Sequence, residues 1–140
     1  MQNLVLDSSV LVAAVRADEE KHGDCLQLIK KVSEGRYFAF EPLTVFVEVV
    51  SALRRRTGSE LLAKRIGADL LNLNNMGFLE FVEDRAAEAA KIARQTGLRG
   101  MDSIVVQVCR EMDAILVTLD NEMALKSRNI VESRKFESFK

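Results

Sequence analysis

Apolar residues recur along the chain with two different periods, and these periods predict its secondary structure. Positions spaced three or four residues apart predict helices over residues 9–15, 22–32, 44–56, 59–72, 84–95, 102–112 and 121–126. Short apolar runs predict strands over residues 4–6, 37–40, 78–82, 114–118 and 130–131. Strands that are apolar throughout and alternate with helices are typical of a parallel sheet covered on both faces. The pattern therefore predicts a single α/β domain over residues 1–140.

Composition and charge narrow the class of protein further. The 140 residues include 20 Lys and Arg against 21 Asp and Glu, a formal net charge of -1, which excludes a histone-like polycation but not a nucleic-acid substrate. With two cysteines far apart and one histidine, a Cys/His zinc site is excluded. No signal peptide and no run of about 20 apolar residues is visible. We therefore expect a cytoplasmic protein that does not enter a membrane.

Three aspartates lie where predicted elements meet. Asp7 follows the strand over residues 4–6, Asp120 follows the strand over residues 114–118, and Asp102 begins a helix. In open parallel sheets, ligands bind beyond the carboxyl ends of the strands. Aspartate is also a favoured helix N-cap, so each of these residues has capping as an alternative role.

Glu48 lies inside a predicted helix, at the edge of its apolar stripe. A carboxylate there loses hydration unless a partner compensates it. One alternative is an ion pair with Arg55, seven residues further on. The other is that Glu48 faces the strand ends and helps to bind a cation there. Carboxylates that converge on one point stay ionised only beside a cation, and oxygen ligands suit Mg²⁺ or Mn²⁺.

Four segments together resemble a known family. They are V-L-D-S-S-V-L-V-A at 5–13, T-x-x-x-E followed by A-L-R-R at 44–55, L-R-G-M-D-S at 98–103 and L-V-T-L-D at 116–120. Their order and context resemble the PIN domain, and within it the VapC-type toxin ribonucleases of prokaryotic toxin–antitoxin pairs. The resemblance implies an α/β/α sandwich around a central, mostly parallel sheet of about five strands.

The same resemblance implies roles for individual residues. It places Ser9 and Thr118 at small hydroxyl positions that orient the acids. Ser8 stands where the family more often has threonine, and Asn121-Glu122 follow the last aspartate, which leaves a contribution from Glu122 open. The implied catalytic and metal-binding acids, with Mg²⁺ or Mn²⁺ as cofactor, are Asp7, Glu48, Asp102 and Asp120.

The implied reaction is endonucleolytic hydrolysis of RNA, although no residue pattern distinguishes RNA from DNA. Arg54, Arg55 and Arg99 are candidate RNA contacts, and a solvated helix face is the alternative for the first two. The family resemblance also implies a homodimer and a small antitoxin partner. Two other functions remain open, namely a catalytically silent PIN-like RNA-binding or scaffold module and a solitary RNA-processing nuclease.

Overall fold

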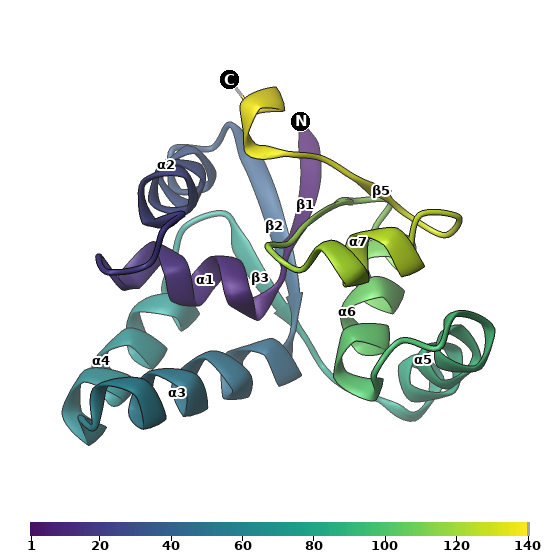
Figure 1. Ribbon diagram of the computed structural model, residues 1–140, viewed down its shortest axis with the longest axis horizontal. Coiled ribbons are helices and arrows are strands. Elements are labelled where there is room, and N and C mark those ends of the chain that lie inside the picture. The colour runs from purple at the N-terminus through teal and green to yellow at the C-terminus, as the bar shows by residue number, and fades with distance from the viewer. Residues whose placement is uncertain (140) are drawn as a thin grey trace.

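A computed structural model describes residues 1–139 and contains one five-stranded sheet (Figure 1). The strand order is β3-β2-β1-β4-β5, and every neighbouring pair is parallel. This confirms the predicted α/β class. The strands are β1 (Gln2–Leu6), β2 (Tyr37–Pro42), β3 (Met76–Leu79), β4 (Ile115–Val117) and β5 (Glu132–Ser133).

Helices cover both faces of the sheet, so the architecture is the expected α/β/α sandwich. Figure 1 shows α1 to α4 gathered on one side of the strands and α5 to α7 on the other. The helices are α1 (Ser8–Val15), α2 (His22–Ser33), α3 (Leu43–Thr57), α4 (Glu60–Leu71), α5 (Glu83–Thr96), α6 (Gly100–Glu111) and α7 (Asn121–Lys126), followed by the 3₁₀ turn η1 (Phe136–Ser138).

Local sequence explains where several of these helices begin and end. The Ser59 hydroxyl accepts a hydrogen bond from the Leu62 N–H and caps α4. Gly58 and Gly97 follow α3 and α5 with φ of 71° and 74°, a left-handed conformation that glycine adopts without strain. The core is centred on β1, where residues 4–6 are fully buried between the two helix layers.

Two strands are displaced along the chain from their predicted positions. We expected the third strand over residues 78–82, but Asn75, with φ of 65°, turns the chain so that pairing with β2 begins at Met76. We expected the last strand over residues 130–131. The N–H groups of Ile130 and Val131 instead donate to the Ser127 carbonyl, which leaves pairing with β4 to residues 132–133.

The parallel arrangement brings the carboxyl ends of β1, β2 and β4 to one edge of the sheet. Asp7 follows β1, α3 with Glu48 follows β2, and Asp120 lies three residues after β4. This edge is where an open parallel sheet binds its ligands. Within residues 1–139, no helix combines the length and the apolar character that crossing a membrane requires.

Candidate active site

Asp7 is buried at the end of β1, and both of its carboxylate oxygens accept hydrogen bonds. Oδ1 accepts the Ser8 N–H at 2.8 Å, which caps α1. Oδ2 accepts the hydroxyls of Ser9 at 2.9 Å and Thr118 at 3.0 Å. The capping alternative therefore holds for Asp7, and it coexists with a second oxygen oriented by two hydroxyl groups.

The hydroxyls of Ser9 and Thr118 connect Asp7 to the segment that follows β4. Thr118 Oγ1 also accepts the Asp120 N–H at 3.0 Å, and Ser9 Oγ accepts the Leu119 N–H at 3.3 Å. In addition, the Asp7 N–H donates to the Val117 carbonyl at 3.0 Å. These bonds hold the first and the last of the four acids in a defined relation to each other.

Asp120 is exposed and caps α7, with Oδ1 accepting the N–H groups of Glu122 at 3.0 Å and Met123 at 3.1 Å. The Glu122 side chain forms an ion pair with Lys126, four residues further on, at 2.7 Å. Glu122 also raises the pKa of Asp102, although less than burial and other acids do. It therefore lies near the site but already has a cationic partner.

Glu48 and Asp102 are partly buried, and the negative charge of Asp7 repels both of them. Burial raises the pKa of Glu48, and the nearby Asp7 and Asp102 raise it further. Burial likewise raises the pKa of Asp102, with further increases from Asp7 and Asp120, while Arg99 lowers it. The four predicted acids therefore interact electrostatically.

The structure has neither an ion pair between Glu48 and Arg55 nor a helix cap at Asp102, the two alternatives that the sequence left open. Among the described residues, Glu48 has no cationic group within 4.0 Å, and Arg55 instead donates from Nε to the Ser51 carbonyl at 3.4 Å. Asp102 is the third residue of α6, and no side-chain hydrogen bond caps that helix. An ion pair and a capping role therefore do not explain these two carboxylates.

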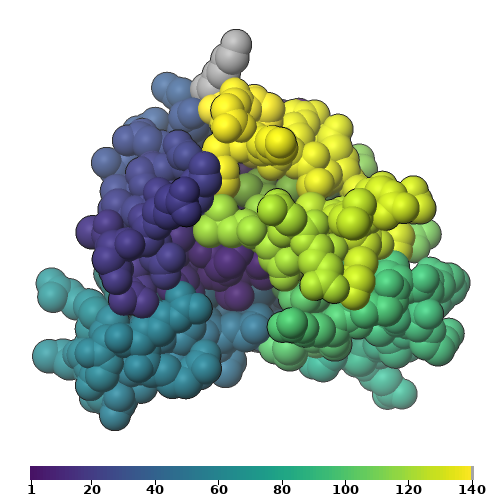
Figure 2. Space-filling model, viewed as in Figure 1, coloured from purple at the N-terminus to yellow at the C-terminus, as the bar shows by residue number. Residues whose placement is uncertain are grey.

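Three hollows meet at the acids. A groove of about 500 Å³ runs from Glu48 and Ser9 to Arg55, and another of about 610 Å³ joins Glu48 and Asp102 to an apolar wall along α5. A crevice of about 30 Å³ is lined by Asp102, Asp120 and Arg99. Figure 2 shows the molecule hollowed between the two groups of helices, with the purple N-terminal segment at the floor.

The predicted arginines differ in their relation to these hollows. Arg55 lines the groove that contains Glu48, and Arg99 lines both the apolar groove and the crevice. Arg54 is exposed on the last turn of α3 and lines none of these three hollows. Arg56, its neighbour, pairs with Glu19 at 3.2 Å.

The donor chemistry of the site fits a hard divalent cation. All the converging side chains offer oxygen, the donor that hard cations such as Mg²⁺ and Mn²⁺ prefer. Across residues 1–139, no three acidic, histidine or cysteine side chains are close enough to hold a metal alone. Mg²⁺ normally takes one or two carboxylates and completes its shell with water and substrate phosphates. The residues present therefore fit such an ion without forming a closed cage.

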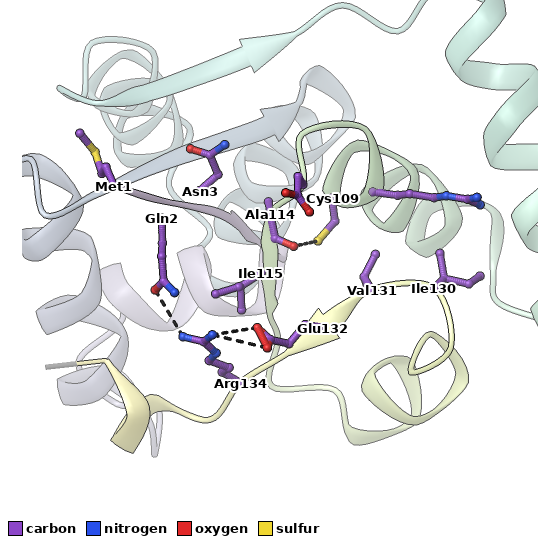
Figure 3. Close-up of a pocket in the computed structure, with 12 residues that line it drawn as sticks. Met1, Gln2, Asn3, Cys109, Ala114, Ile115, Ile130, Val131, Glu132 and Arg134 are labelled. Carbon is purple, nitrogen blue, oxygen red and sulfur yellow. Dashed lines mark hydrogen bonds and ion pairs between the residues drawn. The ribbon is translucent and has the colours of Figure 1, made fainter.

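A separate hollow of about 590 Å³ lies at the opposite edge of the sheet (Figure 3). It is lined by the start of β1 and by residues around β4 and β5. Two acidic residues, Asp113 and Glu132, line it. Glu132 pairs with Arg134 at 3.0 Å, and Arg134 also donates to the Gln2 side chain. Cys109, on its wall, donates to the Ala114 carbonyl. None of the four predicted acids lines this hollow, so it is not the candidate site.

Glu41, the residue before Pro42, is not among the acids predicted from the sequence. Its side chain is fully buried, and Oε1 accepts the Leu6 N–H at 2.6 Å. The signal that indicates it is a single acid within the otherwise apolar run of residues 37–42. Burial raises the pKa of Glu41 well above its ordinary value. The hydrogen bond from the Leu6 N–H lowers it by less, and the charge of Asp7 raises it further.

Comparison with known proteins supports the fold and names the family. The model of the PIN domain matches residues 4–129, and no curated protein matches the sequence. VapC20 of Mycobacterium tuberculosis, a sarcin-ricin loop cleaving toxin, is 18% identical with a TM-score of 0.75, over 94% of this chain and 99% of that one.

Two further solved structures have the same fold. FitAcB from Neisseria gonorrhoeae is 14% identical with a TM-score of 0.72, over 97% of this chain and 99% of that one. VapBC2 from Rickettsia felis, bound to a DNA fragment from its promoter, is 14% identical with a TM-score of 0.66, over 95% and 98%. With an α/β/α sandwich of matching topology and a family match over most of its length, the chain belongs to the PIN domain family.

Proposed function

We propose that this protein is a Mg²⁺- or Mn²⁺-dependent endoribonuclease and the toxin of a VapBC-type toxin–antitoxin pair. The observation that carries this proposal is the meeting of four acids at the carboxyl edge of the sheet, where two hydroxyls orient the buried Asp7. Like charges so close together favour a bound cation. The acids in this role are Asp7, Glu48, Asp102 and Asp120.

The structural neighbours support this choice of reaction. VapC20 is described as a toxin that cleaves the sarcin-ricin loop, and a further neighbour is a toxin–antitoxin complex from Klebsiella pneumoniae. Their identity to this chain is below 20%, so their activities are reasons for the proposal only. The family match over residues 4–129 adds support because it spans all four acids.

Asp7, Asp102 and Asp120 would hold one or two cations, with Glu48 beside them, and water and substrate phosphates would complete each shell. When bound, a divalent ion neutralises charge on the phosphoryl oxygens and lowers the pKa of a coordinated water. Ser9 and Thr118 donate to Asp7 Oδ2 and so restrict its rotation. Glu48 lies next to Asp7 and Asp102, and as a carboxylate beside the cation it would be placed to accept the proton of the attacking water.

Phosphate groups of the substrate need cations beside this acidic centre. Arg99 adjoins Asp102 in the crevice, and Arg55 lies in the same groove as Glu48. We therefore assign Arg99 and Arg55 to the phosphates on either side of the scissile bond. Arg54, which lines none of the three hollows, would contribute at longer range.

Two protein partners form part of the proposal. The toxin–antitoxin complex among the neighbours supports a small antitoxin as inhibitor. Exposed apolar side chains on α4, Leu61 at 73% and Leu71 at 51% exposure, favour a second copy of this chain as the other partner. Leu70, on the same helix, is buried in the core and is not available to a partner.

The test compares the wild-type protein with Asp7→Asn. We expect wild type to bind Mn²⁺ in calorimetry and to cleave a mixed pool of cellular RNA, whereas Asp7→Asn loses cleavage by a factor of about 10³ or more. Thr96→Val is the matched control, because it removes a hydroxyl on α5 that donates to the Ile92 carbonyl and accepts the Leu98 N–H but touches none of the four acids.

Different failures point to different alternatives. Equal cleavage by wild type and Asp7→Asn would identify a contaminating nuclease and refute the site. RNA binding without cleavage, at high enzyme and saturating Mn²⁺, would favour the catalytically silent module. Cleavage in vitro without growth arrest on induced expression would favour a solitary RNA-processing nuclease over a toxin.

A further inference from the structure

The sheet opens between β1 and β2 at the edge that carries the acids. The pairing of β1 with β2 reaches only Leu4↔Ala39, whereas the pairing of β1 with β4 continues to Leu6↔Val117. On its other side, β2 stays paired with β3 up to its last residue, Pro42. The final residues of β1 therefore have no paired backbone on the β2 side.

The side chain of Glu41 occupies this opening. Glu41 belongs to β2, is fully buried, and accepts the Leu6 N–H on Oε1 at 2.6 Å. A buried backbone N–H without a partner costs about 1–3 kcal/mol, so this bond replaces the one that regular pairing would have supplied. The carboxyl group is thus the connection between the two strands at this edge.

The hydrogen bond between the Leu6 N–H and Glu41 lies one residue before Asp7. Leu6 is held from the β2 side by Glu41, while the Asp7 N–H is held from the β4 side by the Val117 carbonyl at 3.0 Å. These two hydrogen bonds, one from each neighbouring strand, locate the backbone from which the Asp7 carboxylate projects. Errors of about 0.5 Å in such groups are enough to impair a functional site.

Glu41 makes this connection without an ionic partner. Its second oxygen, Oε2, has no hydrogen-bond partner in the described part of the chain, and no Lys or Arg there lies within 4.0 Å of the carboxyl group. An ionised carboxyl in such a place carries a large desolvation cost and would add a further negative charge beside Asp7. A protonated carboxyl avoids both.

We propose that Glu41 is a positioning residue of the acid site, a neutral carboxyl that joins β1 to β2 and thereby sets where Asp7 presents its carboxylate to a divalent cation. This inference rests on the proposed metal site. Glu41 is too deeply buried to contact substrate, and its influence passes through the backbone of Leu6.

The experiment measures Mn²⁺ affinity by calorimetry, together with kcat and KM for RNA cleavage, in wild type and two variants. Glu41→Gln keeps an acceptor for the Leu6 N–H and should bind Mn²⁺ within about threefold of wild type. Glu41→Leu removes the acceptor and should weaken Mn²⁺ binding by a factor of about 10–100 and lower kcat with KM unchanged. Val32→Ala, at a buried position near the end of α2, is the control for general loss of stability.

The outcomes separate this role from the proposed function. If wild type binds no Mn²⁺, the metal site and the role of Glu41 are both refuted. If wild type binds Mn²⁺ and Glu41→Leu binds it equally well, only the role of Glu41 is refuted. An equal loss of affinity in Val32→Ala would refute it as well, since instability alone would then explain the effect.

A measurement on wild type covers the case in which Glu41→Leu does not fold. In a Mg²⁺ titration followed by carbon NMR, the side-chain carboxyl resonance of Glu41 should shift together with that of Asp7. The resonance of Glu60, at the exposed start of α4, should stay unchanged. An unmoved Glu41 resonance would show that the two carboxyl groups are not coupled and would overturn the proposal.

Discussion

The buried carboxyl of Glu41 makes the stability of the folded protein depend on pH in a predictable direction. Burial raises the folded-state pKa of Glu41 well above the ordinary value of 4.5 that holds in the unfolded chain. Above that ordinary value the unfolded chain has released this proton, whereas the folded protein still binds it. The contribution of Glu41 to stability is therefore complete below the unfolded-state pKa and declines as pH rises toward the folded-state pKa.

The Glu41→Gln variant isolates this contribution, because it cannot titrate but keeps an acceptor for the Leu6 N–H. One proton of difference between the two states changes the free energy of unfolding by about 1.4 kcal/mol per pH unit. For a domain of this length, that corresponds to about 4 °C in Tm per pH unit. As pH is raised, the Tm of Glu41→Gln should therefore increase relative to that of wild type by about 4 °C for each pH unit.

The assay is differential scanning calorimetry of both proteins between about pH 5 and pH 7, in EDTA at constant ionic strength. All other titrating groups are common to the two proteins, so the difference in Tm reports on Glu41. Glu60→Gln, at an exposed position, is the matched control and should give a constant difference. Parallel curves for wild type and Glu41→Gln would refute the reasoning, since they would mean that Glu41 is ionised in the folded protein.

Three further predictions concern the candidate site. Because Asp7 and Asp120 repel Asp102, Asp102→Asn should raise Tm by about 1–3 °C in EDTA, a range that allows for solvent screening, and should reduce the further rise in Tm when Mn²⁺ is added. A Tm in EDTA that is unchanged or lower would contradict the repulsion. Thr118→Val should weaken Mn²⁺ binding by a factor of about 10–100 in calorimetry, because the hydroxyl that joins Asp7 to the Asp120 backbone is lost. An affinity equal to that of wild type would show that Thr118 does not orient the acids. Arg55→Ala should reduce the slope of log affinity for single-stranded RNA against log salt concentration by about 0.7, whereas Arg110→Ala, at the opposite edge of the sheet, should leave that slope unchanged. Equal slopes in the two variants would show that Arg55 does not contact the RNA.

Sequence alone determined the features that depend on neighbouring residues. The alternation of helices and strands follows from local apolar periodicity, and the structure confirms the parallel α/β class. Asp7 and Asp120 cap the helices that follow them, as their position after a strand indicated. The order of the four motifs also indicated the PIN domain family, which the match over residues 4–129 confirms.

Tertiary structure decided everything that depends on contacts between distant residues. Glu48 had two possible partners in the sequence, and only the packing of α3 against the sheet edge places it near Asp7, while Arg55 bonds to the Ser51 carbonyl instead of pairing with it. Thr118 bonds to Asp7 from 111 residues away, a contact that no local pattern encodes. The burial of Glu41 arises because β1 and β2 part just where its side chain enters, and the free energy of a buried carboxyl depends on that enclosure.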